Sequence, residues 1–355
     1  MNKNGKLRLG SFNFAKGIAI CIVVLGHVVS DFNAEKLTLF YPLLVVLEFL
    51  KTPIVPLFFM ISGYGIVANK SRGTLERTAK MLLIPYVIVM FAFCVLRPVR
   101  DYILTGNWAQ SVNNVESVFL AFLFGIPIPG KVLFGYKLSH CAIVWFLLAL
   151  FWAQNFVPLI LKCKKFWLQV VLVVGCAALG QALFQLDFVY FCIPHGLIAT
   201  TYVYVGYLLK KYALLEKGLP KKWIYAVWLI ISCIYAKWGI FDLCYGVFRI
   251  FWVDYIGVIF LTVTLLVLGI YVGKLEWRVF DIIKNAGIYS YWVLCIHSIE
   301  QKCLPWRSYI RFTADFPNLG FLVALIIKCI IISMGCMLLK KIQKRKYRKR
   351  IKGYV

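Results

Sequence analysis

Long apolar runs separated by short polar clusters make up most of this chain. A helix needs about 20 predominantly apolar residues to cross the hydrocarbon core of a bilayer. Ten runs approach or exceed that length, at residues 12–29, 42–67, 81–96, 142–161, 167–184, 188–209, 223–238, 248–272, 286–299 and 319–339. The pattern predicts an all-α polytopic membrane bundle of about ten transmembrane helices.

Composition agrees with lipid as the main solvent. The chain is 62% hydrophobic and only 15% charged, with a mean hydropathy of +0.82, whereas soluble domains carry about a quarter charged residues. The net charge of +26 lies in short clusters between apolar runs instead of on one basic face. This distribution is typical of membrane topology, and we expect no nucleic-acid partner.

The side on which these clusters lie depends on one short apolar run, residues 115–128. If this run does not cross, the basic clusters at 3–8, 70–80, 162–165, 210–222, 274–284 and 340–352 all face one side. They contain most of the 40 Lys and Arg residues and few of the 14 acids, so the positive-inside rule favours ten spans with both termini cytoplasmic. We expect a transmembrane domain over 1–340 and a basic cytoplasmic tail over 341–355, near anionic membrane lipid.

The twelve cysteines include no C-x-x-C pair and lie mostly within apolar runs. They indicate small buried residues, and we predict no metal site.

The four histidines carry the strongest chemical signal. In the ten-span topology His27, His140, His195 and His297 all come to the outer part of the membrane. An imidazole, with a pKa near 6.5, suits a general base acting on a hydroxyl. The alternative for each histidine is a packing role between helices.

Six segments together resemble the membrane acyltransferase-3 family in order and spacing. They are FNFAKGIAICIVVLGHVV (12–29), PLFFMISGYG (56–65), RTAKMLLIPY (77–86), WFLLAL (145–150), YVYVGYLL (202–209) and GIYSYWVLCIH (287–297). The resemblance implies a ten-helix bundle that moves acetyl from cytoplasmic acetyl-CoA to a hydroxyl of a cell-surface glycan or its lipid-linked precursor. It also implies a bacterial plasma membrane location and no bound cofactor.

The resemblance assigns catalysis to His27, which closes the first helix motif, and to His297, which ends the late one. It assigns donor binding to the basic loop after the second helix, represented here by Arg77 and Lys80, and to Lys16. The chain departs from the family pattern by having Asn13 and Lys16 in place of Asp and Arg. It also has Lys80, and not a second Arg, after Arg77, and lysine attracts a phosphate without forking onto it.

Other polar and aromatic residues are candidates for substrate binding. Ser62 lies in the cytoplasmic half of the second helix, which favours close helix approach over a nucleophilic role. Arg249 and Asp254 flank the outer start of the eighth helix. They either touch a sugar, snorkel to the membrane interface or form a structural ion pair. The full set of candidates is Asn13, Ser62, Tyr64, Trp145, His195, Arg249 and Asp254.

The principal alternative is a transporter of a glycan, a lipid or an acyl donor, since Pro53 and Pro56 also suit a broken transport helix. A membrane sensor without catalysis is a third interpretation. Direct transfer through a general base and a relay through an acylated His27 both remain open. In either case we expect His27 and His297 to converge, and we expect a solvent-reachable hollow to join them to the basic cytoplasmic side.

Overall fold

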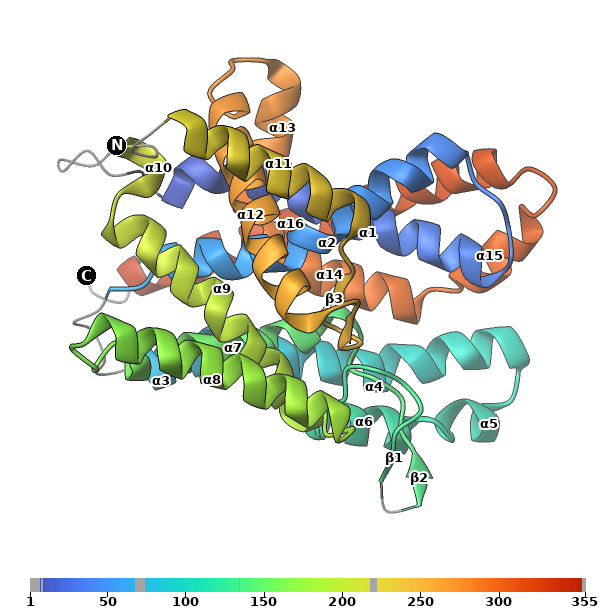
Figure 1. The fold of residues 1–355 in the computed structure, drawn as a ribbon. Helices are drawn as coiled ribbons and strands as arrows, with labels where there is room; N and C mark the ends of the chain where they lie inside the picture. The colour runs from blue at the N-terminus through green and yellow to red at the C-terminus, as the bar shows by residue number, and fades with distance from the viewer. Residues whose placement is uncertain (1–6, 8, 68–73, 134, 218–221, 353–355) are drawn as a thin grey trace.

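The computed structural model describes residues 7, 9–67, 74–133, 135–217 and 222–352. The chain is almost entirely helical (Figure 1). The elements are η1 (Leu9–Phe12), α1 (Asn13–Ala34), α2 (Tyr41–Tyr64), α3 (Thr74–Thr78), η2 (Ala79–Leu83), α4 (Ile84–Thr105), α5 (Trp108–Val112), α6 (Val115–Leu123), β1 (Val132–Leu133), β2 (Tyr136–Lys137), η3 (Ala142–Val144), α7 (Trp145–Ile160), α8 (Phe166–Gln185), η4 (Tyr190–Cys192), α9 (Ile193–Lys211), α10 (Leu214–Lys217), α11 (Lys222–Trp238), β3 (Phe241–Asp242), β4 (Val247–Phe248), α12 (Phe251–Val272), α13 (Arg278–Ile288), α14 (Ser290–Cys303), α15 (Trp306–Phe312) and α16 (Pro317–Lys352).

The predicted all-α membrane bundle is confirmed, and each of the ten apolar runs falls on a helix or a bent pair. Within the described residues, seven helices are long and apolar enough to span a membrane. The bent pair α13–α14, with a 76° break, makes an eighth span if it is counted as one. The remaining two runs lie on α2 and α11, which contain the apolar stretches Leu50–Tyr64 and Ala226–Trp238. The chain is therefore a multi-pass membrane protein.

The short run at 115–128 forms α6, which has nine residues. At 1.5 Å per residue it covers about 13 Å, less than half of a hydrocarbon core. A two-stranded hairpin, β1 with β2, follows it. The run therefore does not supply a spanning helix.

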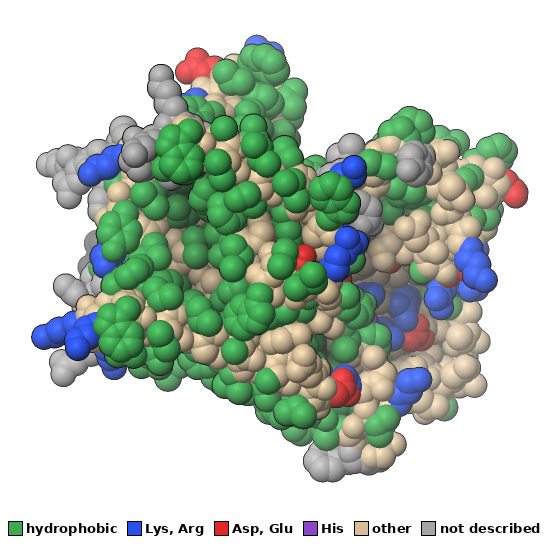
Figure 2. Space-filling model, viewed as in Figure 1, with side chains coloured by type: hydrophobic (Ala, Val, Ile, Leu, Met, Phe, Trp, Pro, Cys, Tyr) green, Lys and Arg blue, Asp and Glu red, His purple; other side chains and the backbone are tan. Residues whose placement is uncertain are grey.

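Helix α9 is the centre of one half of the bundle. Its span is 78% buried, whereas the span in α16 is 17% buried, because α2, α7 and α8 all pack on α9. The face formed by α8, α11 and α12 is almost continuously hydrophobic (Figure 2). This surface suits contact with lipid acyl chains.

Glycines allow two pairs of helices to touch through their backbones. A Cβ on Gly63 would lie 1.8 Å from the Val203 carbonyl oxygen, so α2 and α9 are in backbone contact. A Cβ on Gly287 would lie 1.8 Å from the Asn13 carbonyl oxygen, and one on Gly17 would lie 1.9 Å from that of Ile283. These contacts hold α1 against the α13–α14 pair.

The start of α1, the short helices α3 and α10, and the end of α16 lie toward the same end of the bundle (Figure 1). Helices α5 and α15 lie toward the opposite end. Parts of the basic clusters at 3–8, 70–80 and 210–222 fall outside the described residues. Helix α16 continues through Lys352, so it crosses the expected boundary between 340 and 341 without a break.

Candidate active site

The two histidines of the sequence motifs face each other across α1 and α14. The ring centroids of His27 and His297 are 5.5 Å apart. His297 is fully buried, whereas His27 is half-buried. The expected convergence of these imidazoles is confirmed, and His27 is the more accessible of the two.

Glu300 holds the ring of His297 from the next turn of α14. Its Oε1 lies 2.6 Å from Nδ1 of His297, and its Oε2 accepts a hydrogen bond of 2.7 Å from Nε1 of Trp306. A carboxylate can only accept, so Nδ1 carries the proton and Nε2 presents a lone pair. Nε2 is buried and has no hydrogen-bond partner among the described residues.

Lys328 brings a buried charge into this cluster from the middle of α16. Its Nζ lies 3.2 Å from Oε2 of Glu300 and 3.8 Å from Oδ2 of Asp31, and it stands 4.0 Å from the centroid of the Trp306 ring. Asp31 follows His27 by one helical turn on α1. An acid thus follows each histidine by one turn, and one buried lysine lies against both acids.

The sequence motifs assigned no role to Glu300, Lys328 or Asp31. A signal for the two acids existed, since His27 and His297 each have an acid three or four positions later, on the same helical face. Lys328 also interrupts the apolar run at 319–339. Ionisable residues within spans are usually functional, which is the criterion that would have found it.

Two lysines bring positive charge near the histidine pair. Lys302 and Lys328 lie close enough to His27 to act on it electrostatically, and His140 is a further neighbour. His140, just before the span in η3 and α7, accepts a 3.0 Å hydrogen bond at Nδ1 from the backbone of Ala142. Burial lowers the pKa of His140 to about 3, with the charges of Lys302 and Arg97 acting in the same direction. His140 is therefore neutral, and the positive charge of this region comes from lysine and arginine side chains.

The residues expected to bind the acyl donor lie near the other end of the bundle. Arg77 is exposed on α3, and Nζ of Lys80 lies 2.5 Å from Oε1 of Glu76. Residues 79–83 form a π-helical turn, a local irregularity that is frequent at functional sites. Lys16 is half-buried on α1, and no contact among the described residues joins it to Arg77 or Lys80.

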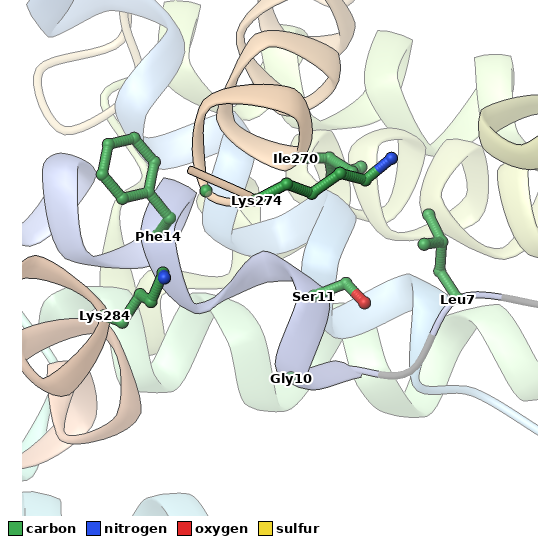
Figure 3. A pocket seen from close by; sticks show the side chains of 8 residues that line it. Leu7, Gly10, Ser11, Phe14, Ile270, Lys274 and Lys284 are labelled. Atoms are coloured by element: carbon green, nitrogen blue, oxygen red, sulfur yellow. The ribbon is translucent and has the colours of Figure 1, made fainter. Parts of the chain in front are cut away.

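A cavity of about 390 Å³ opens beside the start of α1. Figure 3 shows four of the residues that line it, with Lys284 below Phe14 at the left of the view and Lys274 above Ser11 nearer the centre. Nζ of Lys284 also lies 3.3 Å from Oδ1 of Asp281. Both lysines belong to the basic cluster at 274–284, and the structure brings them against the start of α1, which is far from them in the chain.

Asn13, Ser62 and Tyr64 belong to the packing of α1 and α2. The Asn13 backbone lies against Gly287, and the Ser62 hydroxyl accepts a hydrogen bond from the Gln154 amide. The Tyr64 hydroxyl donates a 2.6 Å hydrogen bond to Oε1 of Glu216. No contact among the described residues joins these three to the histidine pair.

His195 and Trp145 form a separate buried group. Their ring centroids are 5.2 Å apart, and the Phe184 ring is 4.8 Å from His195. His195 Nε2 lies 3.1 Å from the Cys244 carbonyl oxygen. The structure does not bring this imidazole to His27.

Arg249 and Asp254 do not share an ion pair among the described contacts. Asp254 is buried, and its carboxylate accepts hydrogen bonds of 2.7–3.0 Å from the backbone amides of Ile240, Arg249 and Ile250. It therefore caps the start of α12 and fixes the preceding hairpin. The Arg249 side chain is exposed.

Comparison with known proteins gives one finding. The family model for an acyltransferase domain, Acyl_transf_3, matches residues 9–339, which include both histidines, Glu300 and Lys328. The searches of curated proteins and of solved structures found no match. The match covers nearly the whole chain, so the protein belongs to the membrane acyltransferase-3 family and is a multi-pass membrane acyltransferase.

Proposed function

We propose that this protein transfers acetyl from acetyl-CoA to a hydroxyl of a cell-surface glycan or its lipid-linked precursor, in the plasma membrane of a bacterium. The observation that carries the proposal is the pairing of an accessible His27 with a buried His297, 5.5 Å away, whose ring Glu300 holds at 2.6 Å. Such a pair, within a chain of the acyltransferase family, suits proton transfer at a hydroxyl.

In direct transfer His27 acts as the general base. A ring nitrogen takes the proton of the acceptor hydroxyl as its oxygen attacks the thioester carbonyl. The carbon–sulfur bond then breaks, and the departing thiolate takes that proton from the imidazolium. The products are an acetyl ester and coenzyme A with a free thiol.

In a relay His27 attacks the thioester itself. An acetyl-imidazole forms as the carbon–sulfur bond breaks, and the ring proton goes to the thiolate. The acceptor hydroxyl then attacks the acetyl-imidazole, and its proton returns to His27. In both routes His297, which Glu300 and Lys328 hold in place, serves as a positioning residue for His27.

We further propose that the exposed cations Arg77 and Lys80 attract the phosphates of the donor, with Lys16 nearer to His27 on α1. Lys16 precedes His27 by 11 residues, or about 16 Å along a helix. An Arg77→Gln variant should raise KM for acetyl-CoA with little change in kcat. The same effect from Lys274→Gln would instead place the phosphates at the cavity of Figure 3.

The decisive experiment supplies labelled acetyl-CoA and a glycan acceptor to the detergent-purified protein. An acyltransferase yields labelled glycan in the absence of any membrane compartment, whereas a transporter yields none. His27→Ala should lower kcat by about 10²–10⁴-fold, the usual contribution of a general acid–base group. Leu25→Ala removes bulk from the same helix and controls for packing. Full activity in His27→Ala would refute the proposal.

A further inference from the structure

The region around the histidine pair holds two cations that form no ion pair with an acid in the part of the chain that the structure describes. Arg97 on α4 donates a 3.2 Å hydrogen bond from Nη1 to Oγ of Ser139, and it has no ion pair with an acid among the described residues. Lys302, at the end of α14, has neither an ion pair nor a side-chain hydrogen bond in the same described set. Both side chains are half-buried.

The neighbouring cations behave differently. Arg100 lies 2.5 Å from Oδ1 of Asp101, and its other Nη donates to the backbone carbonyl of Lys302. Lys328 lies against Glu300. These two have acidic partners within the protein, so Arg97 and Lys302 stand out as a pair of cations without them.

Partly burying a cation without an acidic partner costs free energy. Arg97 and Lys302 act on each other electrostatically, and so do Lys302 and Asp31. Because Asp31 also lies against Lys328, it does not neutralise both lysines. A bound anion would offset the cost of bringing Arg97 and Lys302 together.

The positions of these cations relate them to the reacting histidine. Lys302 acts directly on His27, and both cations act on the neutral His140. Figure 2 shows a hollow between α4 and the group formed by α1, α2 and α15, with Lys and Arg side chains gathered in and around it. Because α4 and α14 pack together, their two cations can reach one ligand.

We infer that Arg97 and Lys302 bind an anionic group of the acceptor, a carboxylate or a phosphate, and thereby place a nearby hydroxyl at His27. This inference rests on the proposed acyl transfer, and it names the substrate class as an acidic glycan or a phosphate-linked sugar. Arginine and lysine are the side chains that pair most strongly with such groups.

The phosphates of the donor do not fit this site. They are separated from the thioester by the length of the pantetheine arm. When the thioester carbon is at His27, those phosphates lie well away from it. Cations beside His27 can therefore meet only the acceptor or the acyl group itself.

The test compares two acceptors that differ in charge alone. An oligosaccharide containing glucuronate is assayed beside its carboxyl-reduced form, with labelled acetyl-CoA as donor. We expect Arg97→Gln and Lys302→Gln each to raise KM for the acidic acceptor by about 10-fold, the scale of one lost charge-assisted contact. KM for the reduced acceptor and for acetyl-CoA should not change. The comparison is repeated with a second pair of acceptors, a sugar phosphate and its dephosphorylated form.

Controls separate binding from folding. Lys237→Gln neutralises an exposed lysine on α11 and should leave both KM values unchanged. Arg97→Lys keeps the charge and should retain most of the affinity. Binding of the acidic oligosaccharide without donor, measured by thermophoresis, should weaken in the two Gln variants even where turnover is low.

Three results would overturn the inference. The first is equal KM for the charged and neutral acceptors in the unmodified protein, with acetyl transfer intact, which leaves the proposed function standing. The second is a loss of acyl transfer in Arg97→Gln and Lys302→Gln that appears with a succinyl donor and not with an acetyl donor. This result would assign the two cations to the acyl group. The third, no transfer to any acceptor, removes the proposed function together with this inference.

Discussion

Two buried histidines, His297 and His195, differ in what holds them. Each is fully buried, each has one ring nitrogen within hydrogen-bond distance of an oxygen, and each has the other without a hydrogen-bond partner in the described chain. His297 meets a carboxylate that a buried lysine also contacts, and it faces a second histidine. His195 meets a backbone carbonyl among aromatic rings.

The difference teaches how to distinguish chemistry from packing. A backbone carbonyl carries no net charge, so the contact of His195 fixes its tautomer and holds the β3–β4 hairpin against α9 without placing a counter-charge beside the ring. A carboxylate stabilises an imidazolium or a chosen tautomer, so the contact of His297 can support proton transfer. Burial alone does not separate the two cases, whereas the chemical nature of the partner does.

The largest effect should follow loss of the acid partner of His297. Glu300→Gln retains the shape but removes the charge that faces His297, Trp306 and Lys328. We expect kcat to fall by about 10²-fold and the protein to lose about 3–5 kcal/mol of stability, because Lys328 loses the nearer of its two acids and keeps only Asp31, at 3.8 Å. Acetyl transfer and thermal unfolding in detergent measure the two effects.

A double variant separates the electrostatic effect of Glu300 on stability from its effect on catalysis. Glu300→Gln combined with Lys328→Met removes both buried charges, so much of the stability should return while kcat remains low. Restored kcat in the double variant would show that the acid serves only to neutralise the lysine.

The His195 side of the comparison predicts the opposite pattern. His195→Leu leaves the buried Cys244 carbonyl without its partner, which should cost about 1–3 kcal/mol of stability. We expect kcat to stay within about twofold of the unmodified protein, by the same two measurements. A kcat defect as large as that of Glu300→Gln, without loss of stability, would make His195 a second reactive centre.

The contact between α1 and α13 should matter to the histidine pair at a smaller scale. Gly287→Ala would place a Cβ 1.8 Å from the Asn13 carbonyl oxygen, so α1 has to move, at a cost of about 1–3 kcal/mol. Because this shift changes the spacing of His27 and His297, kcat should also fall several-fold. The matched control is Gly26→Ala beside His27, where a Cβ meets nothing within 4 Å. Equal kcat for the two alanine variants would contradict this assignment.

The smallest effect concerns a half-buried acid, Glu35, just after α1. Hydrogen bonding to Arg311 and the charges of Arg311 and Arg307 lower the pKa of Glu35. Its contribution to stability is therefore present above the unfolded pKa of about 4.3 and is lost as pH falls through the lower folded value. Glu35→Gln should slightly lower the unfolding temperature at pH 7 and converge with the unmodified protein at strongly acidic pH. A difference in unfolding temperature that persists at strongly acidic pH would show that Glu35 stabilises the protein through packing and not through its charge.

Local pattern was enough to predict most of the fold. The ten apolar runs coincide with helices because the requirement for internal hydrogen bonds in lipid is strictly local. It was also enough to single out His27 and His297, since each ends a motif. One of the ten runs is not a single straight helix, because α13 and α14 bend by 76°, and that bend depends on packing.

The sequence by itself determined that this chain is a helical membrane protein of the acyltransferase-3 type, because hydropathy and motif order are properties of the chain. Tertiary structure decided which polar residues share a site. Lys328 lies 28 positions from Glu300 and Asp31 lies 270 from Gln301, so no local pattern reports their contact. The tertiary structure also places Asp254 and His195 away from the histidine pair. The positions at which helices cross decide which groups a buried polar side chain contacts.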